Sequence, residues 1–572
     1  MTHTTVSRRM HATRLLALVA ALAATPLAGL AGTKASLPML HASGRAIVDT
    51  TGKTVPLRGV NLGGWFIMEK WMSPLDSSNT IADTYGAIQE LDARFGVAKE
   101  QSLIKTYQTN WITTTDLDDL QSAGFNVVRV PVWWGQFYPI NNLSNGSWRA
   151  DAFERLDWLV SKCAARGLYV IIDMHGVVGG QSLSDDTGRA NQNTYWNDAN
   201  AQANTTFMWK QIATHYKGNS TVAAYDLINE PVGTPTNDAA VNAQDNLYKA
   251  VRSVDPDHMI MIEGTFGSWN WSMLPPPSQK GWTNVVYEMH EYQYSNPSSA
   301  GVEAGTDRQV ADFNNHASWN VPGIIGEFND FGNGSATWQY TTNAYNKAGL
   351  SWTMWSYKAT HGLVPDSWGY YDPTHWPATP NVSTDSQATI ASKWAQWTTA
   401  AAFGKNTSLG IDGGGVNNGG SGGGGSVSAT TWFNVVNVRS GLCADAAGWG
   451  TANGTLLQQW ACGAQQANQE WQFQAAGGNL RKVAGRNAPG EVWDVSNTAT
   501  ASGSPTQLWA YGGGTNQQWT PTQRADGNWQ IVGKASNRCL TVAGSSTANG
   551  AALQIADCDG SAAQGWRLVA QP

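Results

Sequence analysis

Short apolar runs alternate with amphipathic segments between about residues 40 and 404 of the chain. Runs of this kind, rich in Val, Ile, Leu and Met, are typical of strands buried on both faces of a parallel sheet. Eight runs with helical patterns between them predict an α/β fold, a (β/α)8 barrel. The runs are Val55 to Val60, Asn126 to Val132, Leu168 to Met174, Val222 to Ile228, His258 to Ile262, Asn284 to Met289, Pro322 to Ile325 and Gly349 to Met354.

Helical patterns fill several of the intervals, over residues 152–166, 203–216, 237–254 and 306–316. Alternating strands and helices also fit a doubly wound open sheet, which is the competing architecture. The Gly-rich phosphate turn that often marks the nucleotide-binding sheets of that kind is absent after the first run. The barrel is therefore the favoured prediction.

Polar side chains follow the C-terminal ends of the apolar runs. The fourth run ends abruptly in Asn229, Glu230 and Pro231, and the seventh leads to Glu327. Because the loops after the strands of a barrel gather on one face, these side chains are candidates for chemistry. One strand-end glutamate alone is more often structural, so the second carboxylate makes Glu230 a candidate acid or base. The other polar strand ends are Arg129, Asp173, His175, His290, Glu291, Tyr292 and Trp355.

Composition restricts the classes of function. The chain has 35 Lys and Arg against 42 Asp and Glu, so its formal net charge of -7 excludes the basic balance of a nucleic-acid-binding protein. Its 29 Trp nearly equal the 17 Tyr and 13 Phe together. Trp presents a flat apolar face with one polar edge, which suits stacking on sugar rings as well as core packing.

The N-terminus has the pattern of an export signal. Basic residues at positions 8, 9 and 14 precede an apolar run from Leu15 to Ala31, followed by small residues that suit a cleavage site. The apolar run is short for a membrane span, and a single transmembrane anchor is the alternative. We expect residues 1–35 to be a signal peptide, and the secreted protein to have no membrane contact once it is removed.

A change of composition separates two domains. Residues 405–428 consist mainly of Gly, Asn and Ser without apolar periodicity, which predicts a flexible linker. It divides a barrel domain over 36–404 from a second domain over 429–572.

The second domain contains an internal repeat. Its three copies close on Trp471, Trp519 and Trp566, which are 48 and 47 positions apart. Units of about 47 residues that cannot bury a core singly predict a pseudo-threefold all-β domain.

Cysteines support this assignment. Cys443 and Cys462 are 19 positions apart, as are Cys539 and Cys558, which predicts two equivalent disulfides in a secreted protein. Cys163 lies in a helical pattern of the barrel domain and is expected to be a buried thiol.

With these residues in view, residues 40–404 resemble glycoside hydrolase family 5. The NLGGW segment, the GGQ stretch after His175 and WSYK from Trp355 more narrowly resemble its exo-1,3-β-glucanase branch. The motifs that carry the family resemblance are RGVNLGGW from Arg58, WIT from Trp111, VRVP from Val128, His175-Gly176, LINEP from Leu227 and GEF from Gly326.

The resemblance implies that Glu230 is the acid/base and Glu327 the nucleophile of a retaining enzyme, with carboxyl groups about 5 to 5.5 Å apart. It also implies which residues complete the site around the cleaved sugar. These are Arg129, His175, Asn229, His290, Tyr292 and Trp355.

The second domain resembles a ricin-B type β-trefoil, carbohydrate-binding module family 13. In that family each lobe binds sugar through an Asp, an aromatic platform and an Asn-Gln pair. The resemblance implies two competent lobes and a structural third, in which Thr541 and Ala556 replace the Asp and the platform. The first lobe offers Asp445, Gln458, Trp460, Asn468 and Gln469, and the second offers Asp494, Gln507, Trp509, Asn516 and Gln517.

We therefore expect a secreted, monomeric, retaining β-glucanase that hydrolyses β-1,3-linked glucan and is tethered to polysaccharide by its lectin-like domain. No cofactor and no metal are expected, since His175 and His290 beside a carboxylate pair favour hydrogen-bonding roles. The alternatives are a 1,4-β-glucanase, a glucan transglycosylase and, from another class, a non-catalytic carbohydrate-binding protein. The presence of both Glu230 and Glu327 on intact motifs argues against the last.

Overall fold

The computed structural model describes residues 37–571 except 144–146, 265–269, 361–367, 410, 412–426, 428–430, 464, 478–479 and 525–527. The expected signal peptide and most of the expected linker lie outside these residues. No helix in the described ranges is long and apolar enough to span a membrane.

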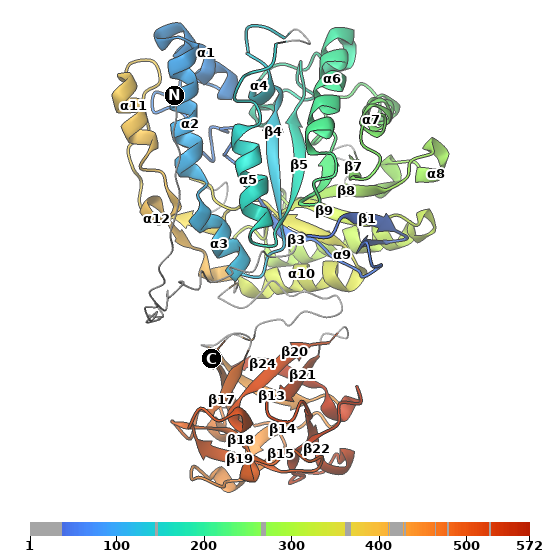
Figure 1. Cartoon of the computed structure of the whole chain (residues 1–572), viewed down its shortest axis with the longest axis vertical. Coiled ribbons are helices and arrows are strands. Elements are labelled where there is room, and N and C mark those ends of the chain that lie inside the picture. Colours follow the sequence, from blue (N-terminus) through green and yellow to red (C-terminus); the bar gives the residue numbers. More distant parts are fainter. Residues whose placement is uncertain are drawn as a thin grey trace, which may run out of the picture. The chain divides into compact units, whose positions relative to one another are not determined.

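Eight parallel strands close into a barrel (Figure 1), as the apolar runs predict. The last strand pairs with both its predecessor and the first, through Trp352 with Ile325 and Arg58. That closure excludes the open sheet. The strands are β3 (Arg58–Asn61), β4 (Val127–Trp133), β5 (Tyr169–Gly176), β6 (Val222–Asp226), β7 (Met259–Glu263), β8 (Val285–Glu291), β9 (Gly323–Phe328) and β10 (Ser351–Met354).

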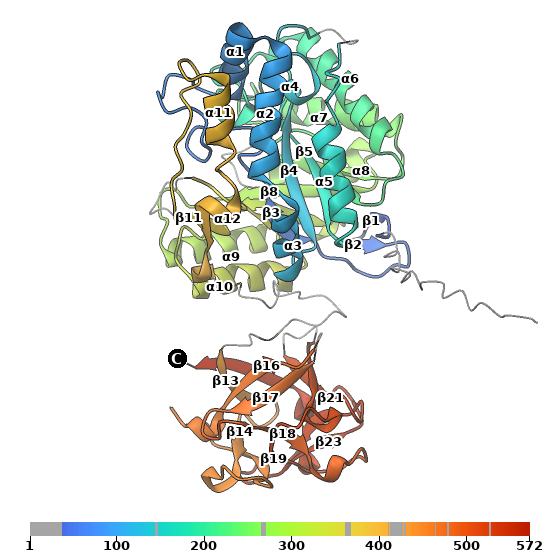
Figure 2. The same cartoon turned by 60° about the vertical axis from the view of Figure 1, so that its left-hand side comes forward.

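Helices run along the outside of the barrel (Figure 2), including all four predicted from periodicity. The helices are α1 (Thr84–Phe95), α2 (Val97–Trp111), α3 (Thr114–Ser122), α4 (Trp134–Phe137), α5 (Glu154–Ala164), α6 (Ala199–Tyr216), α7 (Asn237–Arg252), α8 (Pro277–Lys280), α9 (Ser299–Asn315), α10 (Ser335–Ala348), α11 (Gln387–Trp394) and α12 (Thr399–Ala402).

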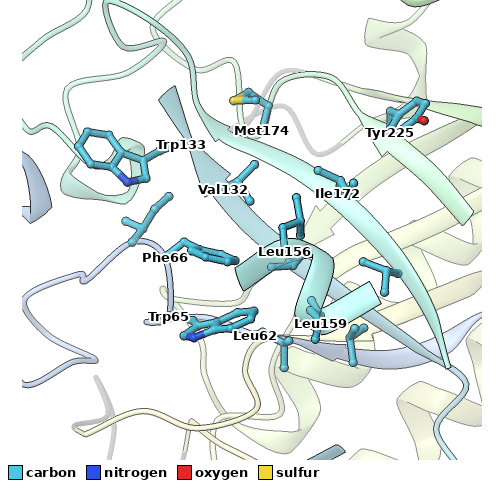
Figure 3. Close-up of a cluster of buried hydrophobic side chains, with 14 of the residues drawn as sticks. Leu62, Trp65, Phe66, Val132, Trp133, Leu156, Leu159, Ile172, Met174 and Tyr225 are labelled. Carbon is cyan, nitrogen blue, oxygen red and sulfur yellow. The ribbon is translucent and has the colours of Figure 1, made fainter. Parts of the chain in front are cut away.

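Alternate strand residues build two apolar layers, because successive side chains of a strand point to opposite faces. Val132 and Ile172 pack outward with Leu156 and Leu159 of α5 (Figure 3). Residues of the other set, such as Ile171, pack inside the barrel. There they meet Leu40 and Ile47 from a hairpin of β1 (Leu40–Ser43) and β2 (Ala46–Asp49). The rigid barrel wall fixes where each strand end projects.

The barrel packing continues past residue 404. β12 (Phe403–Lys405) pairs with β11 (Tyr371–Pro373), and Leu409 and Ile411 are buried in the barrel core. The first residues of the expected linker are therefore packed against the barrel, because these two apolar side chains are held in its core.

Twelve strands in three groups of four form the second domain. In each group a Trp indole N–H donates to a main-chain carbonyl 26 or 27 positions earlier, which repeats one contact three times: Trp471 to Ala444, Trp519 to Trp493 and Trp566 to Leu540. The strands are β13 (Trp432–Asn437), β14 (Cys443–Ala446), β15 (Leu457–Trp460), β16 (Glu470–Ala475), β17 (Arg481–Gly485), β18 (Glu491–Val495), β19 (Thr506–Ala510), β20 (Trp519–Gln523), β21 (Trp529–Gly533), β22 (Cys539–Val542), β23 (Leu553–Ala556) and β24 (Trp566–Gln571).

Both predicted disulfides are present. Cys443 bonds Cys462 and Cys539 bonds Cys558. The first and third groups of strands therefore each contain one internal disulfide, and the second group contains none. Cys163 is a buried free thiol on α5, as predicted.

Candidate active site

Arg129 is the centre of the site at the C-terminal end of the barrel. It projects from β4 and is fully buried. Its Nη1 donates to Glu327 Oε1 across 2.9 Å, and its Nη2 donates to Asn229 Oδ1 across 2.8 Å. Asp226 receives two further bonds, of 2.8 and 3.0 Å. The rigid guanidinium therefore fixes side chains from two other strands, β9 and β6, and from the loop after β6 relative to one another.

Glu327, on β9, is surrounded by donors. The Tyr292 hydroxyl donates to Oε2 across 2.8 Å, opposite the bond from Arg129. Burial alone would raise the pKa of this carboxyl, but the charges of His290 and Arg129 outweigh it and lower the pKa below its usual value. Glu327 is thus held ionised.

Glu230 lies beyond the end of β6, with its side chain 14% exposed. Its Oε1 is 2.8 Å from Nδ1 of His290 on β8. The same nitrogen is 3.6 Å from Oε2 of Glu327, so one imidazole stands between the two carboxyls.

The two glutamates form a close pair. One oxygen of each and one ring nitrogen of His290 all lie within 4.8 Å of one another, a spacing that could also suit a metal ion. Burial opposes the cationic form of His290, but Glu263 and Glu327 raise its pKa well above the usual value. The contacts of His290 Nδ1 with both carboxyls suit a hydrogen-bonded carboxylate pair.

His175 forms a second cationic corner, on β5. Its Nδ1 is 2.6 Å from Asp173 Oδ2, and its ring lies nearly parallel to Trp355 at 5.4 Å. Burial would lower the pKa of His175, but Asp173 raises it to about 9. Its Nε2 is 3.4 Å from the amide of Asn229. All eight barrel residues expected at the site are thus brought together.

Sequence reasoning missed several buried carboxyls of the same site. Asp226 and Glu263 end β6 and β7, Glu288 lies at the centre of β8, and all three are buried. Asn61 of β3 accepts from Arg129 at 3.0 Å. A signal was available, since acidic residues within otherwise apolar strands are rare unless they are paired.

Glu69, in the loop after β3, was missed as well. Trp71 donates its indole N–H to Glu69 Oε2 across 2.9 Å. Asp186, in the loop after β5, lies close enough to feel the charges of His175 and Glu230, and burial raises its pKa to about 7. Both add hydrogen-bonding groups near the carboxylate pair.

In the first lobe of the second domain, Asp445 gathers the expected residues. It accepts from Gln458 at 2.9 Å, Asn468 at 2.7 Å and Gln469 at 3.1 Å. Trp460 stays 43% exposed, as a stacking platform requires.

The second lobe repeats this arrangement. Asp494 accepts from Gln507 at 3.0 Å and from Asn516 at 2.6 Å, and Trp509 is 42% exposed. Gln517 bonds Asp494 and also donates to the Ala510 carbonyl at 2.9 Å, as Gln469 does to the Ala461 carbonyl in the first lobe.

The third lobe differs. Thr541 lies near the Ala563 carbonyl, at 3.4 Å, in place of the Asp-centred set.

A close carboxylate pair on the C-terminal rim of an eight-stranded barrel, on one chain with an all-β trefoil, is the arrangement expected of a glycoside hydrolase. Residues 95–361 match the family model described as cellulase, glycosyl hydrolase family 5, and residues 431–569 match the ricin-type beta-trefoil lectin domain. The chain therefore contains a glycosyl hydrolase family 5 domain followed by a ricin-type lectin domain.

Individual proteins are similar to parts of the chain. A beta-xylosidase of Phanerodontia chrysosporium is 26% identical over 350 residues, which cover 56% of this chain and 70% of that protein. A probable glucan 1,3-beta-glucosidase A of Aspergillus clavatus is 28% identical over 284 residues, 48% of this chain and 64% of that protein. The chain thus spans less than two thirds of the second relative. The crystal structure of rutinosidase from Aspergillus niger is 19% identical, with a TM-score of 0.45 over 59% of this chain and 98% of that chain.

Proposed function

We propose that this protein is a secreted, retaining β-glucanase that hydrolyses β-1,3-linked glucan through a covalent glycosyl-enzyme. The observation that carries the proposal is the approach of Glu230 and Glu327 oxygens to within 4.8 Å. Carboxyl groups about 5 to 5.5 Å apart suit direct attack by one of them, whereas inverting enzymes need about 6.5 to 9.5 Å to admit a water.

Glu327 is the nucleophile in this proposal. Its lowered pKa keeps it ionised, and the bonds from Arg129 and Tyr292 aim it. Oε attacks the anomeric carbon of the bound sugar, the bond from that carbon to the leaving oxygen breaks, and a glycosyl ester forms.

Glu230 supplies the proton to the leaving oxygen. It is the more exposed of the pair, so a leaving group and then a water can reach it. Once the ester forms, Glu230 takes a proton from water, which attacks the anomeric carbon and releases Glu327. His290 contacts Glu230 at 2.8 Å and orients its carboxyl through both steps.

The remaining residues hold the sugar. The Asn229 oxygen is fixed by Arg129, which turns its amide group toward His175 and leaves it placed to meet a sugar hydroxyl. Trp355 offers an apolar face beside them, suited to stacking under a pyranose ring. Glu69 and Asp186 add carboxyl groups that can bind further hydroxyls. With a pKa of about 7, the Asp186 carboxyl is partly protonated at neutral pH and can both donate and accept.

The name of the Aspergillus clavatus relative, a probable glucan 1,3-beta-glucosidase, supports the 1,3 linkage. Because another relative is named a beta-xylosidase, xylan must be tested as a substrate as well. Secretion is supported by the two disulfides, which persist in oxidising compartments. The Asp445 and Asp494 lobes would tether the enzyme to polysaccharide.

Product analysis over time on laminarin, carboxymethylcellulose, pustulan and xylan tests the proposal, with the anomeric configuration followed by NMR. Preferential hydrolysis of laminarin, with products released as the β-anomer, is the expected result, with Glu230→Gln and Glu327→Gln inactive. Preference for carboxymethylcellulose, pustulan or xylan would overturn the specificity. An α-anomeric first product would overturn the retaining mechanism.

A further inference from the structure

A buried carboxyl that this mechanism does not use lies directly behind Glu230. Glu263 ends β7, and its side chain is 2% exposed. Its Oε2 accepts the backbone N–H of Glu230 across 2.6 Å. Its Oε1 is 3.8 Å from His290 Nδ1, the same nitrogen that meets the Glu230 carboxyl. Glu263 thus faces both the main chain and the ring that hold Glu230.

The backbone of Glu230 needs such a partner. Its φ of 39° lies in the left-handed region, which residues other than glycine rarely adopt. Pro231 follows, and a residue before proline favours extended backbone instead. β6 ends at Asp226, so the strand ladder does not reach this peptide. A residue in this conformation persists only where its surroundings fix it.

Glu263 is itself firmly placed. The side chain of Gln244, buried on α7, donates to the Glu263 carbonyl across 2.8 Å and accepts the Glu263 N–H across 3.0 Å. Both main-chain groups of Glu263 are therefore clamped at the strand end. Because its own main chain is fixed, the Glu263 carboxylate can hold the Glu230 backbone N–H in one position.

We propose that Glu263 is a positioning residue for proton transfer: by accepting the Glu230 N–H it fixes the left-handed backbone that brings the Glu230 carboxyl against His290 and beside Glu327. The inference rests on the proposed role of Glu230 as acid/base. Glu263 touches no reacting atom. Its loss misplaces the proton donor and leaves Glu327, with its bonds from Arg129 and Tyr292, in position to attack.

Leaving-group acidity separates this role from a general loss of structure. As Glu327 attacks, the bond from the anomeric carbon to the leaving oxygen breaks, and a phenolate leaving oxygen takes the proton from Glu230. Dinitrophenolate departs without that proton. The ratio of kcat/KM on 2,4-dinitrophenyl and phenyl β-glucosides therefore reports the placement of Glu230, because kcat/KM covers only the steps up to the glycosyl-enzyme.

Glu263→Met removes the acceptor at similar length. We expect kcat/KM to fall about 100-fold or more on the phenyl glucoside, which is the size of loss expected when general acid catalysis is removed. On the dinitrophenyl glucoside the fall should be less than about tenfold. Glu263→Gln keeps an acceptor oxygen and should stay within about tenfold of wild type on both. Glu291→Gln is the matched control, since Glu291 is a buried rim carboxyl that bonds Gln293 and Arg308, and it should leave the ratio unchanged.

An equal fall on both glucosides in Glu263→Met, or no fall, overturns the proposal. If that variant fails to fold by circular dichroism, Glu263→Asp replaces it, since the shorter side chain withdraws the acceptor but keeps the charge, and the same substrate-selective loss is required. Wild-type protein that cleaves neither glucoside and releases no sugar from laminarin would contradict the proposed function itself, whereas active wild type with an unselective Glu263 variant contradicts only the role of Glu263.

Discussion

Arg129 and Glu327 are 198 positions apart in the chain, yet the guanidinium donates to the carboxylate across 2.9 Å with both side chains almost fully buried. The barrel brings them together, because β4 and β9 each deliver one side chain to the same rim. The same guanidinium lies within 3.3 Å of Glu288 and 3.2 Å of Asp173. One cation thus balances several acidic groups.

Arg129→Met should destabilise the barrel by about 3–5 kcal/mol, because it leaves buried carboxylates without their cation. The free energy of unfolding in guanidinium chloride measures this. Arg308→Met is the control, since Arg308 pairs with Glu291 while its own side chain is 54% exposed, and should cost no more than about 1 kcal/mol. Equal effects of the two variants would contradict the assigned role of Arg129.

Tyr292→Phe should move the acidic limb of the pH profile upward. In the proposed mechanism Glu327 must be ionised to attack, and the lost hydroxyl removes a bond that lowers its pKa. A hydrogen bond to a charged group contributes about 1.5–3 kcal/mol, so kcat/KM should begin to fall about one to two pH units higher. Tyr294→Phe alters a ring stacked on Tyr292 at 5.2 Å and should leave the limb in place.

His175 should make the folded state lose stability in alkali. The pKa of His175 is about 9 in the folded protein, above the usual 6.5. The contribution of protonated His175 to the free energy of unfolding is therefore complete below pH 6.5 and is lost as the pH rises through about 9. Thermal unfolding midpoints measured between pH 6 and 10 test this. In His175→Gln the midpoint should fall less over this range than in wild type. His215→Gln, at a half-exposed site beside Asp157, should retain the wild-type slope.

Binding to insoluble glucan should depend on two lobes of the second domain. Asp445→Ala and Asp494→Ala should each weaken retention about tenfold or more, and the double variant should abolish it, because two linked sites bind with avidity. Thr541→Ala, in the third lobe, should change nothing. Depletion of protein from solution by the polysaccharide measures all four, and a loss in the Thr541 variant would contradict the assignment of lobes.

The sequence was sufficient for the barrel because burial on both faces leaves unbroken apolar runs, and Tyr169–Gly176 is readable without tertiary information. It was also sufficient for Glu230 and Glu327 as candidates, because each follows such a run. Glu263 and Glu288 escaped notice because alternate strand residues face opposite sides, and which side is the barrel interior depends on the register between neighbouring strands. The left-handed backbone of Glu230 is likewise set by its tertiary partner, and Pro231 in fact favours another conformation.

Every disulfide of the chain lies in the trefoil, whereas the only cysteine of the barrel domain is the isolated, buried Cys163. Reductant therefore acts on two hairpins of the carbohydrate-binding part and has no covalent crosslink to cut near the carboxylate pair. Protein treated with dithiothreitol should lose its binding to insoluble polysaccharide before it loses turnover of a soluble glucoside. Reduction would then separate polysaccharide binding from catalysis in the intact chain.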